Sequence, residues 1–441
     1  MRATKASRRP AAPPAGRSPK AGGRFRELLR KLGPGLITGA ADDDPSGIAT
    51  YSQGGALVGF GALWTLLFTY PLMVGIQVVS ARLGCVTGRG LAANIRRSYP
   101  VWFLYLLVGL LVFANTVNIA ADIAAMGDAA ELVTGAPSAV YEIGFAAFSL
   151  ILQIFVPYGR YVRILKWLTL ALLAYVAVLF VVDIPWIDVA RQALIPQNFA
   201  DGEYVPIIVG IFGTTISPYL FFWQAAQEVE EQRNGHGDRP LRRDSATARR
   251  HLRRIKIDTY IGMAFSNLIA FIIMLSTAVT LHAQGVHDIE TSAQAAEALR
   301  PIAGDFAFQM FALGIVGTGL LAVPVLAGSA AYAVAEALRW PAGLDLKPGA
   351  AKGFYTIIAV STLLGVAFDF SSVAPMKALL AAAIVNGVIA VPMMAVLMRM
   401  AADRHVMGSF AITRRLKVLG WSATVVMAAM AVLLVWTLLR G

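Results

Sequence analysis

The sequence predicts an all-α, polytopic membrane protein with about eleven membrane-spanning helices. The chain of 441 residues is 57% hydrophobic and only 15% charged, whereas about 25% of the residues of a soluble globular domain are charged. Its apolar residues gather in eleven segments, most of them close to the roughly 20 residues that a helix needs to cross a bilayer. Lys and Arg residues gather between alternate segments, which is typical of cytoplasmic loops.

The membrane domain is expected to span residues 32–441. Its apolar segments lie at 36–56, 58–80, 102–126, 139–156, 162–183, 204–226, 255–282, 304–336, 353–369, 375–399 and 419–439. Residues 1–31 hold ten Lys or Arg and no long apolar run, which predicts a disordered basic tail.

The charges of the loops predict the orientation of the chain. Lys and Arg are frequent in 81–101, 227–256 and 399–418, and nearly absent from 127–138 and 283–303. Basic loops stay on the cytoplasmic side of a membrane, so we expect a multi-pass protein of the inner (plasma) membrane with a cytoplasmic N-terminus. The net charge of +12 then reflects topology, and we expect a lipid partner and no nucleic-acid partner.

Segments one and six each carry a polar, proline-containing patch near the middle. The first reads GAADDDPSGIA around Pro45, and the sixth reads GTTISPYLF around Pro218. Proline removes a helical hydrogen bond, and a broken helix inside the bilayer is tolerated where it lines a buried site. Paired breaks are typical of transporters built from inverted repeats. We therefore expect discontinuous helices one and six in a LeuT-like arrangement of two five-helix repeats, 36–183 and 204–399, with an extra helix at 419–439.

The two breaks offer the donors of a divalent cation site. Asp44 supplies a carboxylate, the interrupted helices free backbone carbonyls, and Thr214 and Ser217 add hydroxyls. Oxygen donors of these kinds suit divalent cations, and a buried carboxylate needs a charge partner. Simpler interpretations stay open: a helix N-cap or a surface loop for the aspartates, and hydrogen bonds between helices for the hydroxyls.

At these residues the chain resembles the NRAMP (natural resistance-associated macrophage protein) family of proton-coupled divalent metal transporters. Residues 33–47, GPGLITGAADDDPSG, are similar to the first-helix region that leads to the family's DPGN motif, and residues 213–222, GTTISPYLFF, are similar to its sixth-helix GATVMPHNLY. The resemblance implies secondary transport of Mn²⁺, Fe²⁺ or Mg²⁺ coupled to protons, with the metal as substrate, no enzymatic activity and no cofactor.

The resemblance also implies a set of metal ligands. The family's aspartate, asparagine, backbone carbonyl and methionine correspond to Asp44, Gly47, Thr214 and Ser217. A tenth-helix amide corresponds to Asn386, for which a packed amide is the alternative. A thioether favours transition metals, so the hydroxyl of Ser217 predicts an all-oxygen site closer to the preference of Mg²⁺ or Mn²⁺, as in the related magnesium-transporting branch.

Further polar residues are candidates for a proton pathway. The histidines that follow the family's sixth-helix proline correspond to Tyr219 and Gln224, and a third-helix acid is retained as Asp122, whereas Ala125 stands where a second acid is expected. Asn118 shares a helix face with Asp122. The alternative for this face, which also holds Asn115, is a cluster of hydrogen bonds between helices.

Some charged residues lie outside the family pattern. Asp42 and Asp43 have no counterpart in the motif, and we expect an acidic vestibule there, with a second ion site or a solvated edge as alternatives. For Glu228, Glu230 and Glu231 a solvated cap paired with arginine is favoured over a role in proton release. The five histidines show no metal-ligand spacing, so no role is assigned to them.

Three rival functions remain. An organic-solute symporter on the same fold is disfavoured, because three adjacent aspartates would repel a substrate carboxylate. An intramembrane enzyme would have to pair Asp44 with Asp122, and a second catalytic motif is missing. Saturable, pH-dependent uptake would argue against a channel. No GxxxxGK motif followed by Ser or Thr is present, so ATP-driven transport is unsupported.

Overall fold

The protein is described by a computed structural model that covers residues 38–39, 41–156, 172–196, 204–236, 245–368 and 374–440. Within these ranges the chain is helical and contains no strand. Residues Pro34–Gly441 form one compact unit. The expected basic tail, 1–31, lies outside the described residues.

The membrane domain consists of long helices joined by short helical turns. In chain order the helices are α3 (Pro45–Val58), α4 (Leu63–Thr87), α5 (Leu91–Ser98), α6 (Val101–Thr134), α7 (Ser138–Phe155), α9 (Leu173–Val178), α10 (Trp186–Leu194), α11 (Val205–Thr215), α12 (Pro218–His236), α13 (Ser245–Thr280), α14 (Ser292–Glu297), α15 (Arg300–Ala303), α16 (Ala307–Leu338), α17 (Lys352–Phe368), α18 (Pro375–Ala402), α19 (Arg404–Met407) and α20 (Arg414–Leu438). A 3₁₀ turn, η1 (Gly59–Ala62), follows α3, and another, η4 (His282–Gln284), follows α13.

The observed helices match the expected membrane segments. Among the described residues, eight helical stretches are long and apolar enough to cross a membrane. One of them, Pro45–Thr87, contains most of expected segments one and two, and the shorter apolar helix Lys352–Ala367 corresponds to segment nine. The first part of expected segment five, residues 162–171, lies outside the described residues. The all-α polytopic fold is confirmed.

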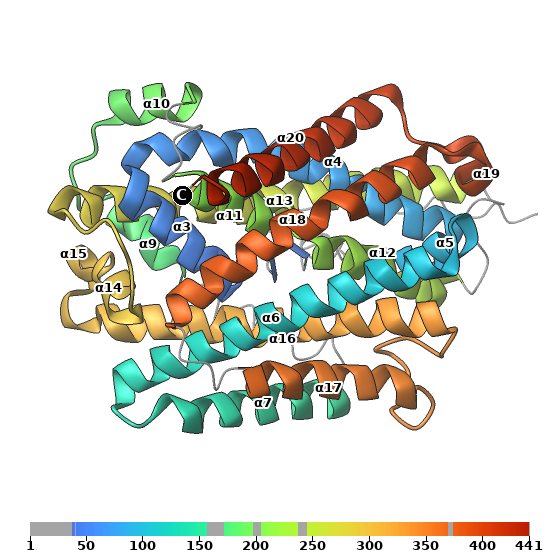
Figure 1. Cartoon of the computed structure of the whole chain (residues 1–441), viewed down its shortest axis with the longest axis horizontal. Helices are drawn as coiled ribbons and strands as arrows, with labels where there is room; N and C mark the ends of the chain where they lie inside the picture. Colours follow the sequence, from blue (N-terminus) through green and yellow to red (C-terminus); the bar gives the residue numbers. More distant parts are fainter. Residues whose placement is uncertain are drawn as a thin grey trace, which may run out of the picture. The chain divides into compact units, whose positions relative to one another are not determined.

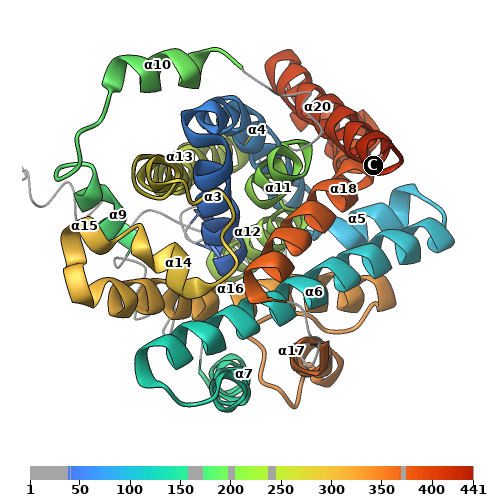
Figure 2. The same ribbon diagram turned by 60° about the vertical axis from the view of Figure 1, so that its left-hand side comes forward.

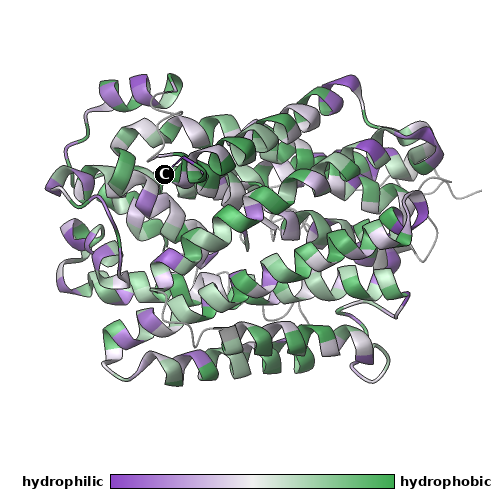
Figure 3. Cartoon of the chain, viewed as in Figure 1, coloured by the Kyte–Doolittle hydropathy of each residue, from purple (hydrophilic) through white to green (hydrophobic). Residues whose placement is uncertain are grey.

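Burial separates the central helices from those that face lipid. In the sixth segment, Val205–Arg233, 94% of the apolar window is buried, against 17% for Ser138–Phe155 and 28% for Arg414–Leu438. Large apolar side chains such as Ile151 and Val425 are therefore exposed, as expected where lipid is the solvent. Figure 3 shows hydrophilic residues gathered towards the helix ends and loops.

Two groups of helices surround the broken segments. In Figures 1 and 2, α6, α7, α16 and α17 lie side by side, and α3, α4, α11 and α13 form a second group. α18 packs against both α6 and α11 and so joins the groups. Its contact with α11 is close, because a Cβ at Gly213 would lie 2.0 Å from the carbonyl oxygen of Ala383.

Both expected helix breaks are present. A helical stretch that includes Asp42 is interrupted at Asp43, and Asp44 is extended (φ −72°, ψ 170°) before α3 begins at Pro45. The sixth segment stops being helical at Ile216 (φ −116°, ψ 62°), and a new helix begins at Pro218. Since proline cannot donate a helical hydrogen bond, it fits the first position of each new helix. The prediction of discontinuous helices one and six is confirmed.

Candidate metal-binding site

Asp44 lies inside the protein at the first break and caps α3. Its side chain is buried, with 1% of the residue exposed. Oδ1 accepts hydrogen bonds from the Gly47 backbone N–H (2.7 Å) and the Ser46 hydroxyl (2.8 Å). The Gly47 N–H is one of the N-terminal groups that the helix itself leaves unpaired. The N-cap interpretation therefore describes the local geometry, and the surface-loop interpretation is wrong.

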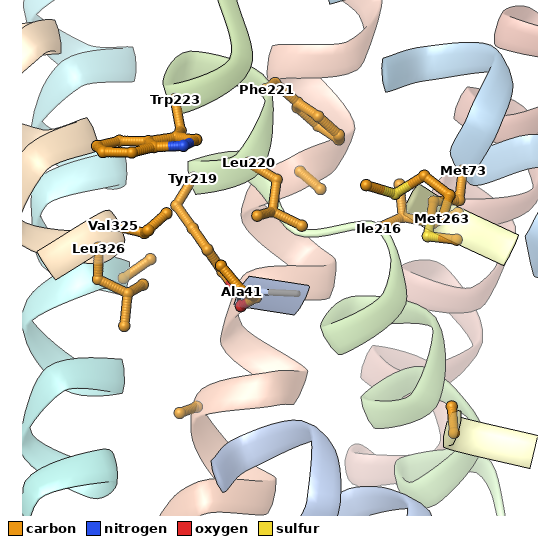
Figure 4. Close-up of a cluster of buried hydrophobic side chains, with 14 of the residues drawn as sticks. Ala41, Met73, Ile216, Tyr219, Leu220, Phe221, Trp223, Met263, Val325 and Leu326 are labelled. Carbon is orange, nitrogen blue, oxygen red and sulfur yellow. Dashed lines mark hydrogen bonds between the residues drawn. The ribbon is translucent and has the colours of Figure 1, made fainter. Parts of the chain in front are cut away.

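The second carboxylate oxygen of Asp44 faces two other helices. Asn118 Nδ2 on α6 donates to Oδ2 over 3.1 Å, and the hydroxyl of Tyr219 on α12 lies 3.2 Å from it. The same hydroxyl lies 3.1 Å from the carbonyl oxygen of Ala41, just before the break. Figure 4 shows Tyr219 reaching from α12 towards Ala41. Asp44 therefore connects both broken segments with the third.

The second break lies against the first. A Cβ built on Gly47 would be 3.3 Å from the hydroxyl oxygen of Thr214, so the side chain of Thr214 packs directly against the backbone of Gly47. Ser217 Oγ is turned back onto α11, where it lies 2.8 Å from the carbonyl of Gly213 and 2.7 Å from that of Thr214. Its one proton serves these carbonyls, while its oxygen lone pairs stay available.

Two of the expected ligands, Gly47 and Asn386, make other contacts than a direct approach to a metal at Asp44. Gly47 stands at the position of the family's asparagine ligand, but it has no side chain to offer and lies in the first turn of α3, where its carbonyl belongs to the helical ladder and its N–H donates to Asp44. Asn386 on α18 donates to Asn118 Oδ1 over 3.4 Å, and its own Oδ1 is buried without a hydrogen-bond partner among the described residues. Asn386 therefore contacts the Asp44 cluster through Asn118.

The polar face of α6 divides into two parts. Asp122 is fully buried near Asp44 and the Ser46 backbone, and neither carboxylate oxygen has a hydrogen-bond partner of ordinary geometry in the described part of the chain. Asn115 instead donates to the Leu326 carbonyl and the Ser329 hydroxyl of α16, at 2.8 and 2.7 Å. Asn115 joins helices, whereas Asp122 belongs to the Asp44 cluster.

Asp42 and Asp43 lie in the interior, on the α13 side of the break. They are 1% and 3% exposed, which excludes the solvated-edge interpretation. The Ser266 hydroxyl of α13 lies 2.6 Å from Asp42 Oδ2 and 3.1 Å from Asp43 Oδ1. One hydroxyl proton cannot serve both carboxylates at once. The pair is therefore incompletely satisfied, and within the described ranges Asp42 Oδ1 has no hydrogen-bond partner.

The far end of α12 forms a separate polar region. Gln224 donates to Thr259 on α13 over 3.0 Å, and no contact between it and Asp44 is described. Glu228 and Glu231 both pair with Arg254, as expected for an arginine-paired cap. Glu228 is only 2% exposed, however, so the expectation that this cap is solvated is wrong for it.

A cavity of about 690 Å³ nearby is lined by Glu230, Tyr332 and Glu336, among others, and by none of the Asp44 cluster.

The cluster around Asp44 is anionic and rich in oxygen donors. The ion pairs recorded among the described residues involve none of Asp42, Asp43, Asp44 and Asp122. In the same part of the chain, no three His, Cys, Asp or Glu side chains converge to hold a metal ion. A cation bound at Asp44 would therefore have at most two close carboxylates, completed by hydroxyl, amide or carbonyl oxygens.

Two contributors were missed in the sequence. Ser46 follows Pro45 directly and supplies a hydroxyl to Asp44, which its position in a capped first turn would have indicated. Ser266 is far from Asp44 along the chain, on the apolar helix α13, and nothing local in the sequence connects it with the aspartates.

Comparison with known proteins identifies relatives along nearly the whole chain. The family model described as "Natural resistance-associated macrophage protein-like" matches residues 35–437. A protein named divalent metal cation transporter MntH from Deinococcus radiodurans is 27% identical over 430 residues, covering 94% of this chain and 92% of the relative. One with the same name from Yersinia pestis is 28% identical over 312 residues, covering 67% and 71%.

Solved structures share the fold. A manganese transporter from Eremococcus coleocola, crystallised with an aromatic bis-isothiourea compound, superposes with a TM-score of 0.71 at 17% sequence identity and covers 96% of each chain. A mutant of that transporter, H236A, gives a TM-score of 0.73 at 16% identity, again over 96% of each chain.

Proposed function

The chain belongs to the natural resistance-associated macrophage protein-like (Nramp) family, and from this premise we propose that it carries divalent metal ions across a membrane through a site at Asp44. Family membership makes the chain a transporter and not an enzyme, so the pairing of Asp44 with Asp122 is not an enzymatic one. The ion would bind beside Asp44, where the breaks of segments one and six meet.

One observation carries this proposal: a buried carboxylate lies at a helix break and faces a second break. Asp44 is 1% exposed and is not part of any recorded ion pair among the described residues. Acidic groups inside a membrane protein are costly unless a cation or proton compensates them. The carbonyl of Thr214 and the oxygens of Ser217 and Asn118 lie on neighbouring segments and supply the neutral donors that a divalent ion requires.

The donor set favours a hard or borderline ion. A methionine would supply a soft sulfur ligand, and the serine at this position supplies oxygen only. We therefore propose that the site prefers Mn²⁺ or Mg²⁺ as cargo. Fe²⁺ would come next, and softer metals would be carried least well. An organic-solute symporter is the alternative, but four buried aspartates in this region disfavour a substrate that carries its own carboxylate.

Proton coupling is part of the proposal. Asp122 is buried close to Asp44 without a well-formed hydrogen bond in the described part of the chain, so it can carry a proton while Asp44 holds the metal, and the two cations would cross the membrane together. Asp42 and Asp43 would extend this negative region towards α13 as a buried vestibule. Gln224 has no described contact with this cluster, so we leave it out of the pathway.

The orientation completes the proposal. The basic loops support a cytoplasmic N-terminus and a position in the inner (plasma) membrane. Modification of single cysteines introduced at Arg89 and Asp288 by a membrane-impermeant reagent tests this, since the first should be accessible from inside and the second from outside. The natural cysteine, Cys85, is buried and would be replaced by alanine first.

Uptake into proteoliposomes tests the transport function. Purified protein should carry Mn²⁺ or Mg²⁺ saturably. The interior of the vesicles should become more acidic during uptake, as reported by an enclosed pH-sensitive dye. Asp44→Asn keeps a capping side chain at the start of α3 and should abolish uptake while the melting temperature stays close to wild type. Asp305→Asn, on an exposed turn, is the matched control. If neither ion is transported or bound, the metal assignment is wrong; metal uptake without dye acidification would reject only the proton coupling.

A further inference from the structure

A second cluster of metal-binding atoms lies at the opposite end of α3 from Asp44. The Nδ1 atom of His282 lies 2.8 Å from the carbonyl oxygen of Ala56, and the Nδ1 atom of His287 lies 3.3 Å from the same oxygen. The centres of the two rings are 4.9 Å apart, with their planes at 72°. Two imidazole nitrogens therefore lie within contact distance of one carbonyl oxygen.

These distances match those between neighbouring ligands of one metal ion. Imidazole nitrogens bind such ions at about 2.0–2.1 Å, so two ligands on the same ion are roughly 3.0–3.4 Å apart for right-angled or tetrahedral arrangements. The separations of 2.8 and 3.3 Å are close to that range. Hydrogen bonds from both rings to the carbonyl would give similar distances, and this capping role is the alternative that an experiment must exclude.

The position also favours a cation electrostatically. Ala56 lies in the last turn of α3, and the capping N–H of Gly59 bonds to the carbonyl of Gly55 rather than to that of Ala56. Carbonyls at a helix C-terminus carry the negative end of the helix dipole. The carbonyl of Ala56 therefore attracts positive charge.

The surrounding residues hold both imidazoles in place. Gln53 donates to the carbonyl of His287 (3.1 Å) and accepts from the N–H of Ile289 (2.8 Å), which fixes the loop on α3. Gly59 has φ +61°, and a Cβ there would lie 3.0 Å from the ring of His282. Any other residue at position 59 would be strained and would displace this imidazole.

We infer that His282, His287 and the carbonyl of Ala56 form a second metal site that binds imidazole-preferring divalent transition metals. Two imidazoles with one carbonyl suit Mn²⁺, Fe²⁺, Co²⁺, Ni²⁺ or Zn²⁺, and not Mg²⁺ or Ca²⁺, which prefer oxygen. Water completes the coordination, because His287 is exposed.

The site is separate from Asp44 and would act before it. Ala56 and Asp44 are twelve residues apart on one helix, or about 18 Å at 1.5 Å per residue. In the proposed orientation this end of α3 faces the outside. The role as an entry site rests on the proposed transport function: it selects transition metals over Mg²⁺ at the mouth, which the oxygen-only donors near Asp44 do poorly.

Binding can be tested without transport. Titration calorimetry of the full chain carrying Asp44→Ala should show one Ni²⁺ per chain and no Mg²⁺ at this site. His287→Gln keeps an N–H donor for the Ala56 carbonyl but removes the imidazole, so it separates metal binding from helix capping. We expect Ni²⁺ affinity to fall at least about tenfold, because losing a ligand costs more than losing one of its outer hydrogen-bond partners. His405→Ala, on the surface helix α19, should leave it unchanged.

Unchanged Ni²⁺ affinity in both His287→Gln and His282→Ala would overturn the site and leave helix capping as the role of the pair. In the otherwise wild-type chain, His287→Gln should raise KM for Mn²⁺ uptake without changing kcat, and Mg²⁺ uptake should stay as it was. An equal effect on both ions would overturn the selective role. Loss of all transport in wild type would instead count against the proposed function, and the calorimetry would still report on the histidines.

Discussion

The hydroxyl of Tyr219 lies 3.2 Å from Oδ2 of Asp44, although 175 residues separate them along the chain. This contact joins the second half of the sixth segment to the break in the first. Asp44 directly precedes Pro45 and Tyr219 directly follows Pro218, so the contact joins the starts of two half-helices. The metal proposal depends on that meeting point.

Tyr219→Phe should weaken metal uptake without unfolding the protein. The substitution removes one neutral donor to Asp44, worth about 0.5–1.5 kcal/mol, so KM should rise by roughly two- to tenfold. Asn118, Ser46 and Gly47 still hold the carboxylate. Steady-state uptake of Mn²⁺ measures the change, with Tyr355→Phe, whose hydroxyl donates to the Leu346 carbonyl, as control. Identical kinetics for the two variants would show that Tyr219 does not act on the ion.

Ser217→Met should change the ranking of metals. A thioether at this position adds a soft ligand beside Asp44, so uptake of Cd²⁺ and Fe²⁺ should increase relative to Mg²⁺. The loss of the hydroxyl also removes its hydrogen bonds to the carbonyls of Gly213 and Thr214. Competition between metals in proteoliposomes measures the order, and an unchanged order would mean that this side chain does not face the ion.

Asp42→Asn and Asp43→Asn test the buried vestibule. Each removes one negative charge from a pair that shares a single hydroxyl, so folding should be maintained or improved, while the local attraction for cations falls. We expect a higher KM for the metal, and therefore slower uptake at low metal concentration, together with a weaker dependence of uptake on ionic strength. Ser266→Ala, which keeps both charges, is the matched control. Wild-type rates in both aspartate variants would remove the vestibule from the mechanism.

Gly213→Ala should destabilise the contact between α11 and α18. The added methyl would lie 2.0 Å from the Ala383 carbonyl and 2.7 Å from the Gly387 nitrogen, so the helices must separate, at a cost of about 1–3 kcal/mol. Gly109→Ala on α6 is the control, since no atom lies within 4 Å of its new methyl. Melting temperatures in detergent should fall for the first variant only.

Arg254→Gln should destabilise the folded protein more than the loss of a surface ion pair does. Glu228 would remain buried without its partner, and breaking a buried pair on one side costs about 3–5 kcal/mol. Arg300→Gln removes an exposed pair with Glu297, and its effect should stay below about 1 kcal/mol. Thermal unfolding of the two variants compares them directly. Double substitution of Arg254 and Glu228 by Gln should recover part of the loss.

The membrane segments and both breaks followed from local features of the chain. Apolar run length is sufficient to place a helix in lipid, and Pro45 and Pro218 mark breaks wherever the helices pack. Asp44 was also identifiable, because a carboxylate that directly precedes such a break inside an apolar segment is costly to bury unless it caps a helix or faces a cation. The resemblance to a known family added the ligand roles, of which those of Gly47 and Asn386 changed once their contacts were visible.

Positions that depend on packing could not be inferred in the same way. Ser266 meets Asp42 only because α13 lies against the first break, and Asn118 turns out to touch Asp44 directly. His282 and His287 have no metal-ligand spacing along the chain, and they converge only because the turn after α13 folds onto the end of α3. Sequence periodicity specifies which side chains share one helix face, whereas distances between helices depend on side-chain volumes throughout the bundle. The hydrophobic pattern therefore determined the segments and their breaks, and the tertiary packing alone decided which polar groups meet.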